Sequence, residues 1–129
     1  MKIDLDFNTQ GRNRINAYTA GSVVISDKVF SSNLILSPDT IIDDRLPEDI
    51  SQLKPDDLDQ IIELQPEVVL LGTGASLLFP EHAITAFFTS RNVGIEVMDT
   101  GAACRAYNIL LADDRRVVAA LFMIQARAV

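Results

Sequence analysis

The sequence predicts a single-domain α/β fold (α+β mixed) built around a mixed sheet. The chain has 129 residues, about the length of one domain. Short apolar segments separated by turn residues fill the first half, which is typical of antiparallel strands. The second half alternates helices and apolar strands in the order α-β-α-β-α-β. We expect residues 1–129 to form one domain, with helices on one face of a central sheet and the early strands extending that sheet or packing against it.

The first half predicts several short strands. Residues 3–7 alternate apolar and acidic side chains, the period of a half-buried strand. Gly21 and a hairpin turn at residues 26–28 separate the apolar segments that follow, and residues 37–39 end the run. We expect strands at residues 3–7, 15–20, 22–25, 29–30, 33–36 and 41–42.

Proline marks the start of two helices in the second half. Pro55 suits the first helical position, three aspartates follow it at the positive end of the helix dipole, and Pro66 stops the helix. Residues 67–72 form a continuous apolar run, which predicts a strand buried on both faces. Pro80 opens the second helix and residues 92–94 close it. Apolar faces are expected from Leu58, Ile61 and Ile62 in the first helix and from Ile84, Phe87 and Phe88 in the second.

The C-terminal third predicts a strand, a helix and a final strand. Residues 95–98 are apolar, and Thr100 is a candidate N-cap for the helix that follows. Residues 113–114 form a turn before an apolar strand at residues 117–124. The core-facing side of this helix is expected to carry Ala103, Tyr107, Leu110 and Leu111.

Composition narrows the class of protein. No apolar run approaches the roughly 20 residues that span a membrane. The first residues lack the apolar centre of a signal peptide, and the single cysteine excludes an intramolecular disulfide framework. We therefore expect a soluble, cytoplasmic protein with no direct membrane insertion.

The net charge of −7 is concentrated in one segment. Residues 39–67 hold ten acidic side chains against Arg45 and Lys54, a net of −8. Negative charge repels a phosphate backbone, which disfavours nucleic-acid binding. Two interpretations remain open for this segment: a solvated face, or a docking surface for a basic partner.

The Gly-Thr-Gly sequence at residues 72–74 allows two interpretations. It follows a strand, but Leu77 stands where a dinucleotide fingerprint would have a third glycine, and no Gly-Lys-Ser/Thr follows. One interpretation is a tight turn that needs permissive backbone angles. The other is a small-ligand or anion site built on exposed backbone N–H groups.

Conventional catalytic motifs are lacking. Ser76 does not lie in a Gly-x-Ser-x-Gly elbow, and His82 is expected at the surface in the first turn of a helix. One histidine and one cysteine cannot supply a conventional zinc site. Cys104 is either activated by a helix N-terminus or simply a small buried residue. We expect no catalytic residue, metal or cofactor.

A polar set remains as the candidate site. Arg105 and Asn108, spaced i, i+3, share a helix face that differs from the apolar one. Together with neighbouring strand ends they could line one polar pocket, in which the guanidinium of Arg105 binds an anion. The alternative is structural, with Arg105 pairing internally and Asn108 holding a loop. The candidate residues are Gly72, Thr73, Gly74, Thr100, Arg105 and Asn108.

Five segments, in this order, carry a resemblance over nearly the whole chain. They are residues 15–18, 68–74, 94–100, 103–108 and 115–121, with the Gly-Thr-Gly turn and an Arg-x-Tyr-Asn helix as the most specific parts. The chain resembles the small family of unknown function that includes mitochondrial respiratory complex I assembly factor 3 and an adipogenesis-associated Mth938-domain protein. Family members commonly have Thr where Ala106 stands and Glu where Asp114 stands. The mitochondrial member has a targeting extension, so its lack here favours a bacterial origin.

The resemblance implies a three-layer β/β/α domain with a central mixed sheet and no established catalysis. We therefore expect a non-enzymatic binding or assembly factor whose partner is a protein, with a membrane-complex subunit as one candidate. The alternative is a small-molecule-binding protein or enzyme that uses the polar pocket. Phe79, Phe87 and Phe88 are expected in the core rather than in a dimer interface.

Overall fold

The computed structural model describes residues 11–125. Its strands are β1 (Ile15–Thr19), β2 (Ser22–Ile25), β3 (Lys28–Phe30), β4 (Leu34–Leu36), β5 (Ile41–Ile42), β6 (Val68–Gly72), β7 (Gly94–Met98) and β8 (Val117–Leu121). Its helices are η1 (Ile50–Gln52), η2 (Pro55–Leu58), α1 (Asp59–Ile62), α2 (His82–Thr89) and α3 (Thr100–Ala112), of which η1 and η2 are 3₁₀ helices. The predicted strand at residues 3–7 lies outside the described residues.

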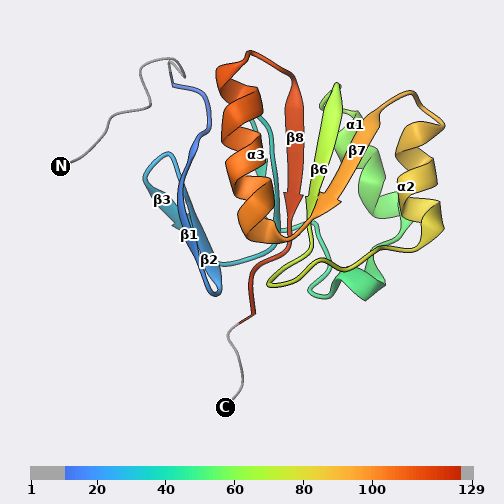
Figure 1. Ribbon diagram of the computed structural model, residues 1–129, viewed down its shortest axis with the longest axis horizontal. Helices are drawn as coiled ribbons and strands as arrows, with labels where there is room; N and C mark the ends of the chain where they lie inside the picture. The colour runs from blue at the N-terminus through green and yellow to red at the C-terminus, as the bar shows by residue number, and fades with distance from the viewer. Residues whose placement is uncertain (1–10, 126–129) are drawn as a thin grey trace.

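A five-stranded mixed sheet forms the centre of the domain, in the order β5-β4-β8-β6-β7 (Figure 1). Strand β6 pairs in parallel with both β7 and β8, whereas β4 is antiparallel to β8 and to β5. Strands β6 and β8 are buried along almost their whole length. The mixed α/β fold and its mixed sheet are therefore confirmed.

The first three strands form a separate antiparallel sheet in the order β1-β2-β3, at the left of Figure 1. Ser26 and Asp27 turn the chain between β2 and β3 with positive φ angles of 48° and 68°, as a two-residue hairpin of this kind requires. The early strands thus do both things expected of them: β4 and β5 extend the central sheet, and β1–β3 pack against it through α3.

Helices cover both faces of the central sheet, so the prediction of helices on one face is wrong. Ala103, Tyr107 and Leu111 of α3 pack with the small sheet and with Leu70 in one core cluster. On the opposite face, α1, α2 and η2 pack against Val69 and Leu71 of β6 and Val118 of β8. The chain moves in one direction from β6 to β7 and in the opposite direction from β7 to β8. Crossovers of the same hand therefore place α2 and α3 on opposite faces.

Several boundaries differ from the prediction for local reasons. The helix that begins at Pro55 starts as η2 and becomes α-helical only at Asp59. Residues 122–124 are not part of β8, and only an isolated bridge joins Ile124 to Ala20. Asp99, not Thr100, is the N-cap of α3: its carboxylate accepts a hydrogen bond from the Ala102 amide at 2.8 Å.

Candidate functional site

The ends of β6, β7 and β8 are bonded together by Thr100. Its hydroxyl donates to the Phe122 carbonyl at 2.5 Å and accepts from the Gly74 amide at 2.8 Å. Its own amide donates to the Gly74 carbonyl at 2.9 Å. Because Thr100 is only 1% exposed, its polar atoms bond to neighbouring backbone groups and not to solvent. These bonds join the segments that follow β6, β7 and β8.

The Gly-Thr-Gly turn is equally self-contained. A Cβ added to Gly72 would lie 3.0 Å from the Thr100 hydroxyl oxygen, and Gly74 has a φ of +101° that favours glycine. The Thr73 hydroxyl donates to the Ser76 carbonyl at 2.6 Å and accepts from the Leu78 amide at 3.0 Å. The conformation of this loop thus follows from its own hydrogen bonds and from close packing on α3.

Asn108 attaches the small sheet to α3. Its amide Nδ2 donates to the Ile15 carbonyl at 2.7 Å, and its Oδ1 accepts from the Ile15 amide at 3.0 Å. The side chain therefore pairs with Ile15 as a neighbouring strand would. This contact joins residues 93 positions apart, next to an irregularity in the β1–β2 register.

Arg105 lies on the same face of α3 and contacts β1. Its Nη1 donates to the Tyr18 hydroxyl, and its guanidinium carbon lies 5.9 Å from the centroid of the Tyr18 ring. Gly101 makes this possible, because a Cβ there would approach the Tyr18 ring to 2.9 Å. A cavity of about 330 Å³ opens between β1 and α3, lined by Ile15, Asn16, Ala17, Tyr18, Cys104, Arg105 and Asn108.

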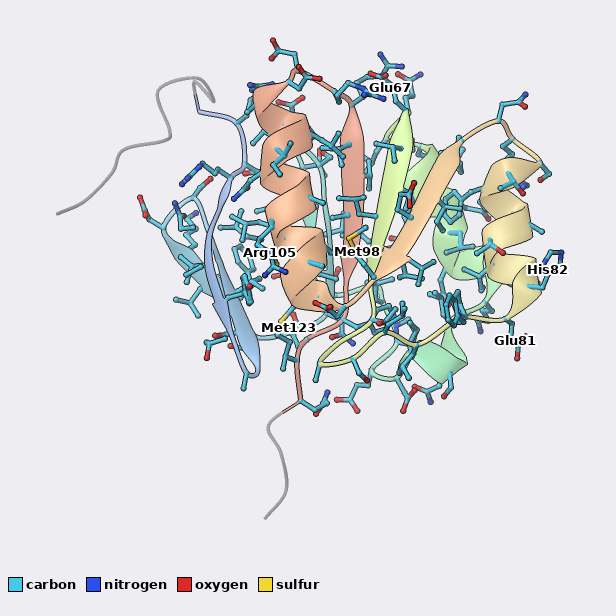
Figure 2. All side chains as sticks on the ribbon, in the orientation of Figure 1. Glu67, Glu81, His82, Met98, Arg105 and Met123 are labelled. Atoms are coloured by element: carbon cyan, nitrogen blue, oxygen red, sulfur yellow. The ribbon has the colours of Figure 1, made fainter. Side chains whose placement is uncertain are left out.

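The six candidate residues thus divide between separate places. Arg105 and Asn108 line the cavity beside β1, and Thr73 lines a second, larger cavity. Gly72, Gly74 and Thr100 line neither of them, because they are buried in the junction between the strand ends. Figure 2 shows Arg105 on α3 and His82 at the start of α2, on the opposite side of the view.

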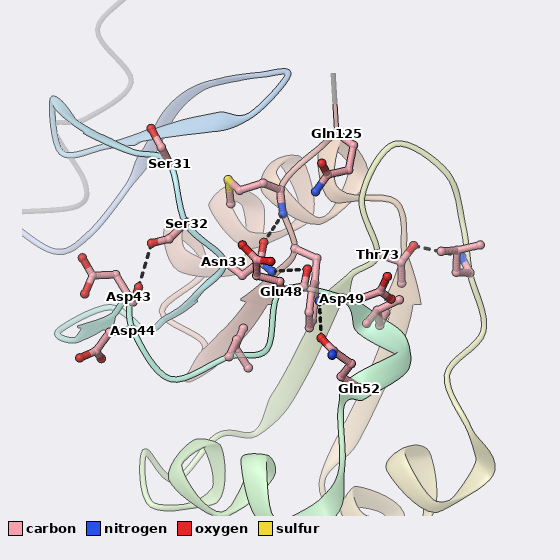
Figure 3. Close-up of a pocket in the computed structure, with 15 residues that line it drawn as sticks. Ser31, Ser32, Asn33, Asp43, Asp44, Glu48, Asp49, Gln52, Thr73 and Gln125 are labelled. Carbon is pink, nitrogen blue, oxygen red and sulfur yellow. Dashed lines mark hydrogen bonds between the residues drawn. The ribbon is translucent and has the colours of Figure 1, made fainter. Parts of the chain in front are cut away.

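The larger cavity, of about 860 Å³, carries a concentration of negative charge (Figure 3). Its wall includes Asp43, Asp44, Glu48 and Asp49, and among residues 11–125 no Lys, Arg or His side chain lines it. It opens at the end of the central sheet where β6 and β8 finish and β4 begins. We call it the acidic groove. Its lining residues are Ser31, Ser32, Asn33, Asp43, Asp44, Leu46, Glu48, Asp49, Ile50, Gln52, Thr73, Leu78, Phe122, Met123 and Gln125.

Neutral polar side chains brace the walls of the acidic groove. The amide of Asn33 donates to the carbonyls of Pro47 and Glu48 at 2.8 and 3.0 Å, and its oxygen accepts from the Met123 amide at 2.7 Å. The Ser32 hydroxyl donates to the Asp43 backbone carbonyl at 2.8 Å. These contacts fix the loop at residues 43–49 against the sheet, and Figure 3 shows those to Asp43, Glu48 and Met123 as dashed lines.

The carboxylates on this loop form fewer hydrogen bonds and ion pairs than its backbone does. Within residues 11–125, the side chains of Asp43 and Glu48 make no ion pair. The Oδ1 atom of Asp44 lies 3.8 Å from Nε of Arg45, and both side chains are largely exposed. This ion pair therefore contributes little to stability. The backbone amide of Ser51 donates to Asp49 and holds the pKa of that carboxyl below its usual value. The groove therefore carries negative charge at neutral pH.

An exposed apolar loop borders the acidic groove. Leu77, Leu78 and Phe79, between β6 and α2, are 47%, 48% and 81% exposed, and Leu78 lines the groove itself. Phe88 is buried and Phe87 is partly buried beneath the guanidinium of Arg91, at 3.6 Å. The prediction of a core position is therefore wrong for Phe79. Three consecutive exposed apolar side chains are uncommon at the surface of a monomer.

The titratable groups offer little nucleophilic chemistry. Cys104 is buried, and this burial raises the pKa of its thiol to about 12, which opposes formation of a thiolate. His82 is exposed at the start of α2. Within the described part of the chain, no group of three or more His, Cys, Asp or Glu side chains is arranged to hold a metal ion. Among the same residues, no helix is long and apolar enough to cross a membrane.

A family model described as "Protein of unknown function (DUF498/DUF598)" matches residues 15–122. The solution structure of a Mth938-like domain from Bordetella pertussis superposes with a TM-score of 0.78 at 25% identity, covering 97% of this chain and 92% of that one. These matches confirm the family resemblance found in the sequence.

Two curated relatives have names that concern membranes or assembly. The "13 kDa major membrane protein" of Francisella tularensis is 29% identical over 102 residues, which cover 78% of this chain and 82% of that protein. The "NADH dehydrogenase [ubiquinone] 1 alpha subcomplex assembly factor 3" of Danio rerio is 36% identical over 61 residues. That match covers 47% of this chain and 35% of the Danio protein.

Proposed function

We propose, from the premise that the chain belongs to the DUF498/DUF598 family of proteins of unknown function, that it is a non-enzymatic binding or assembly factor for a protein complex. The observation that carries the proposal is the exposed loop of Leu77, Leu78 and Phe79. Burial of exposed apolar side chains in an interface lowers the free energy, and this hydrophobic contribution dominates most protein–protein association. A group of such side chains on the surface therefore marks an interaction site.

The hydrogen bonding of the predicted site supports the same proposal. Three of the predicted side chains form hydrogen bonds with the backbone of other residues: Thr73, Thr100 and Asn108. In residues 11–125, every buried side-chain nitrogen and oxygen has a hydrogen-bond partner. An enzyme would need polar groups that reach a substrate, and these side chains hold the fold instead.

The relatives' names support the finer part of the proposal. One relative is named as an assembly factor and another as a membrane protein, so the partner we propose is a subunit of a membrane complex. We propose that the chain binds this partner in the cytoplasm, through the exposed surface of the folded domain. With a net charge of −7, the chain is poorly suited to nucleic acid as the partner.

Affinity capture of the tagged chain, expressed at its native level, tests this function. The tagged full chain should recover one protein in a constant ratio, and the untagged chain should compete for that protein. Recovery of the domain alone, from both soluble and detergent extracts, would overturn the proposal. The double variant Asp27→Asn/Glu63→Gln, which lies outside the groove, should recover the same protein as wild type.

The cavity beside β1 supports a second candidate function, the binding of a small anion. Within residues 11–125, Arg105 is the only Lys or Arg side chain that lines it, and no carboxylate pairs with this guanidinium. The guanidinium has five donors, and Tyr18 engages one of its nitrogens. Thermal-shift measurements against anionic metabolites test this candidate. Arg105→Ala should abolish any shift, and a shift that survives this change would exclude the site.

A further inference from the structure

We propose that the acidic groove, together with the apolar loop beside it, binds a basic peptide segment of the partner that inserts apolar side chains between its cationic ones. The inference rests on the proposed function and names its surface and the class of its ligand. It joins two observations, a cavity lined by four carboxylates and a row of exposed apolar side chains at the edge of that cavity.

Charge complementarity identifies the occupant. The groove is lined by Asp43, Asp44, Glu48 and Asp49, and by no cationic side chain of residues 11–125. Figure 3 shows these acids spread along the cavity, with Asp43 and Asp44 near one end and Asp49 towards the other. An extended segment with several Lys or Arg side chains could therefore meet more than one carboxylate. Interactions of this kind increase the association rate and fix the register of binding.

Apolar contacts supply the second half of the recognition. Leu46, Ile50 and Phe122 contribute apolar surface to the groove, and Leu78 continues it to the exposed ring of Phe79. A peptide with apolar side chains between its basic ones would cover this surface. Aromatic side chains, phenylalanine among them, are enriched at protein interfaces relative to the rest of the surface.

The same charges disfavour two other occupants. Anionic lipid headgroups would be repelled by four carboxylates beside the apolar loop, although the loop alone could insert into a membrane. A second copy of this chain would bring another strongly acidic segment, residues 39–67, which carries a net charge of −8. A basic segment gains from both features of the surface.

The test measures the anisotropy of a short fluorescent peptide of alternating lysine and leucine as the full chain is added. Binding should weaken steeply as sodium chloride rises from 0.1 to 1 M, because the Debye length falls from about 10 Å to about 3 Å. Peptides with glutamate in place of lysine, or with serine in place of leucine, should bind at least about tenfold more weakly.

Paired variants locate the binding. Asp43→Asn/Glu48→Gln removes two charges without altering any ion pair described in residues 11–125, and should weaken binding about fivefold. Leu78→Ser/Phe79→Ser should weaken it about tenfold or more. The controls lie outside the groove: Asp27→Asn/Glu63→Gln removes the same charge, and Ile109→Ser replaces an apolar side chain that is 69% exposed, between the values for Leu78 and Phe79. Both controls should bind as wild type does.

Several results would overturn the inference. They are equal weakening by the groove variants and their controls, sedimentation with phosphatidylglycerol vesicles that depends on Phe79, or a dimer that Phe79→Ser dissociates. Capture of a partner that the groove variants retain fully would reject this surface while leaving the proposed function intact. The lack of any captured partner would reject the function itself.

Discussion

Replacing Asn108 by alanine should loosen the attachment of the small sheet to α3. The side chain makes two hydrogen bonds to the backbone of Ile15, at 2.7 and 3.0 Å. Each contributes about 1 kcal/mol net, so their loss costs about 2 kcal/mol. Alanine is a better helix former than asparagine by about 0.6 kcal/mol, which offsets part of that cost. We therefore expect the free energy of unfolding to fall by about 1.5 kcal/mol.

Urea denaturation followed by far-UV circular dichroism measures this change. With a slope of about 1.5 kcal/mol/M, the midpoint should move down by about 1 M while the slope stays unchanged. Arg105→Ala is the matched control, because it lies on the same face of α3 and its contact with Tyr18 is exposed. This control should change the free energy of unfolding by less than about 0.5 kcal/mol.

A second substitution at the same position tests the direction of the hydrogen bonds. Asn108→Asp keeps the acceptor for the Ile15 amide but turns the donor that faces the Ile15 carbonyl into a second acceptor. The loss relative to wild type should be large at pH 7 and should shrink below about pH 4, where a protonated carboxyl can donate. The reasoning is refuted if Asn108→Ala matches the Arg105→Ala control, or if the Asn108→Asp loss does not depend on pH.

Three further predictions concern the junction of the strand ends and the buried thiol. Thr100→Val keeps the shape of the side chain but removes its two hydrogen bonds, so the free energy of unfolding in urea should fall by about 2 kcal/mol; an unchanged midpoint would contradict this. Gly72→Ala places a methyl group 3.0 Å from the Thr100 hydroxyl and 3.1 Å from its Cα, and thermal unfolding should show a loss of about 1–3 kcal/mol. The pKa of Cys104 is raised from 9.0 to about 12 by burial, so the folded state holds this proton longer than the unfolded chain. The contribution of this thiol to the free energy of unfolding should be fully present below pH 9 and should decrease as the pH rises towards 12. In Cys104→Ala the free energy of unfolding should decrease less steeply over this range, and an unchanged slope would refute the prediction.

Local sequence patterns located most elements because each of them depends on nearby residues. The continuous apolar run before Gly72 predicted the buried strand β6, and the hairpin turn at residues 26–28 predicted the β2–β3 connection. The N-cap of α3 was misplaced because Asp99 and Thr100 are adjacent and both types cap helices well. Only the burial of Thr100 against Gly74 and Phe122 separates the two, and that depends on segments distant in sequence.

The same limit explains why the residues predicted to share one polar pocket lie in two separate cavities and a buried junction within the described part of the chain. Helical spacing correctly placed Arg105 and Asn108 on one face of α3, but it could not show that this face meets β1. The position of the Gly-Thr-Gly turn relative to α3 depends on how the parallel strands are ordered, which no local pattern specifies.

The acidic groove lay beyond local patterns for a further reason that bears on function. Its wall combines residues 31–33, 43–52, 73–78 and 122–125, which meet only because β4 runs antiparallel to β8 while β6 runs parallel to it. At this edge of the sheet, polar residues close to the strand ends, such as Thr100 and Asn33, are used to hold the backbone. The loops farther out keep their carboxylates and apolar side chains exposed. Recognition by this domain should therefore depend on the loops around β5 and before α2, and substitutions there should alter partner binding while leaving stability nearly unchanged.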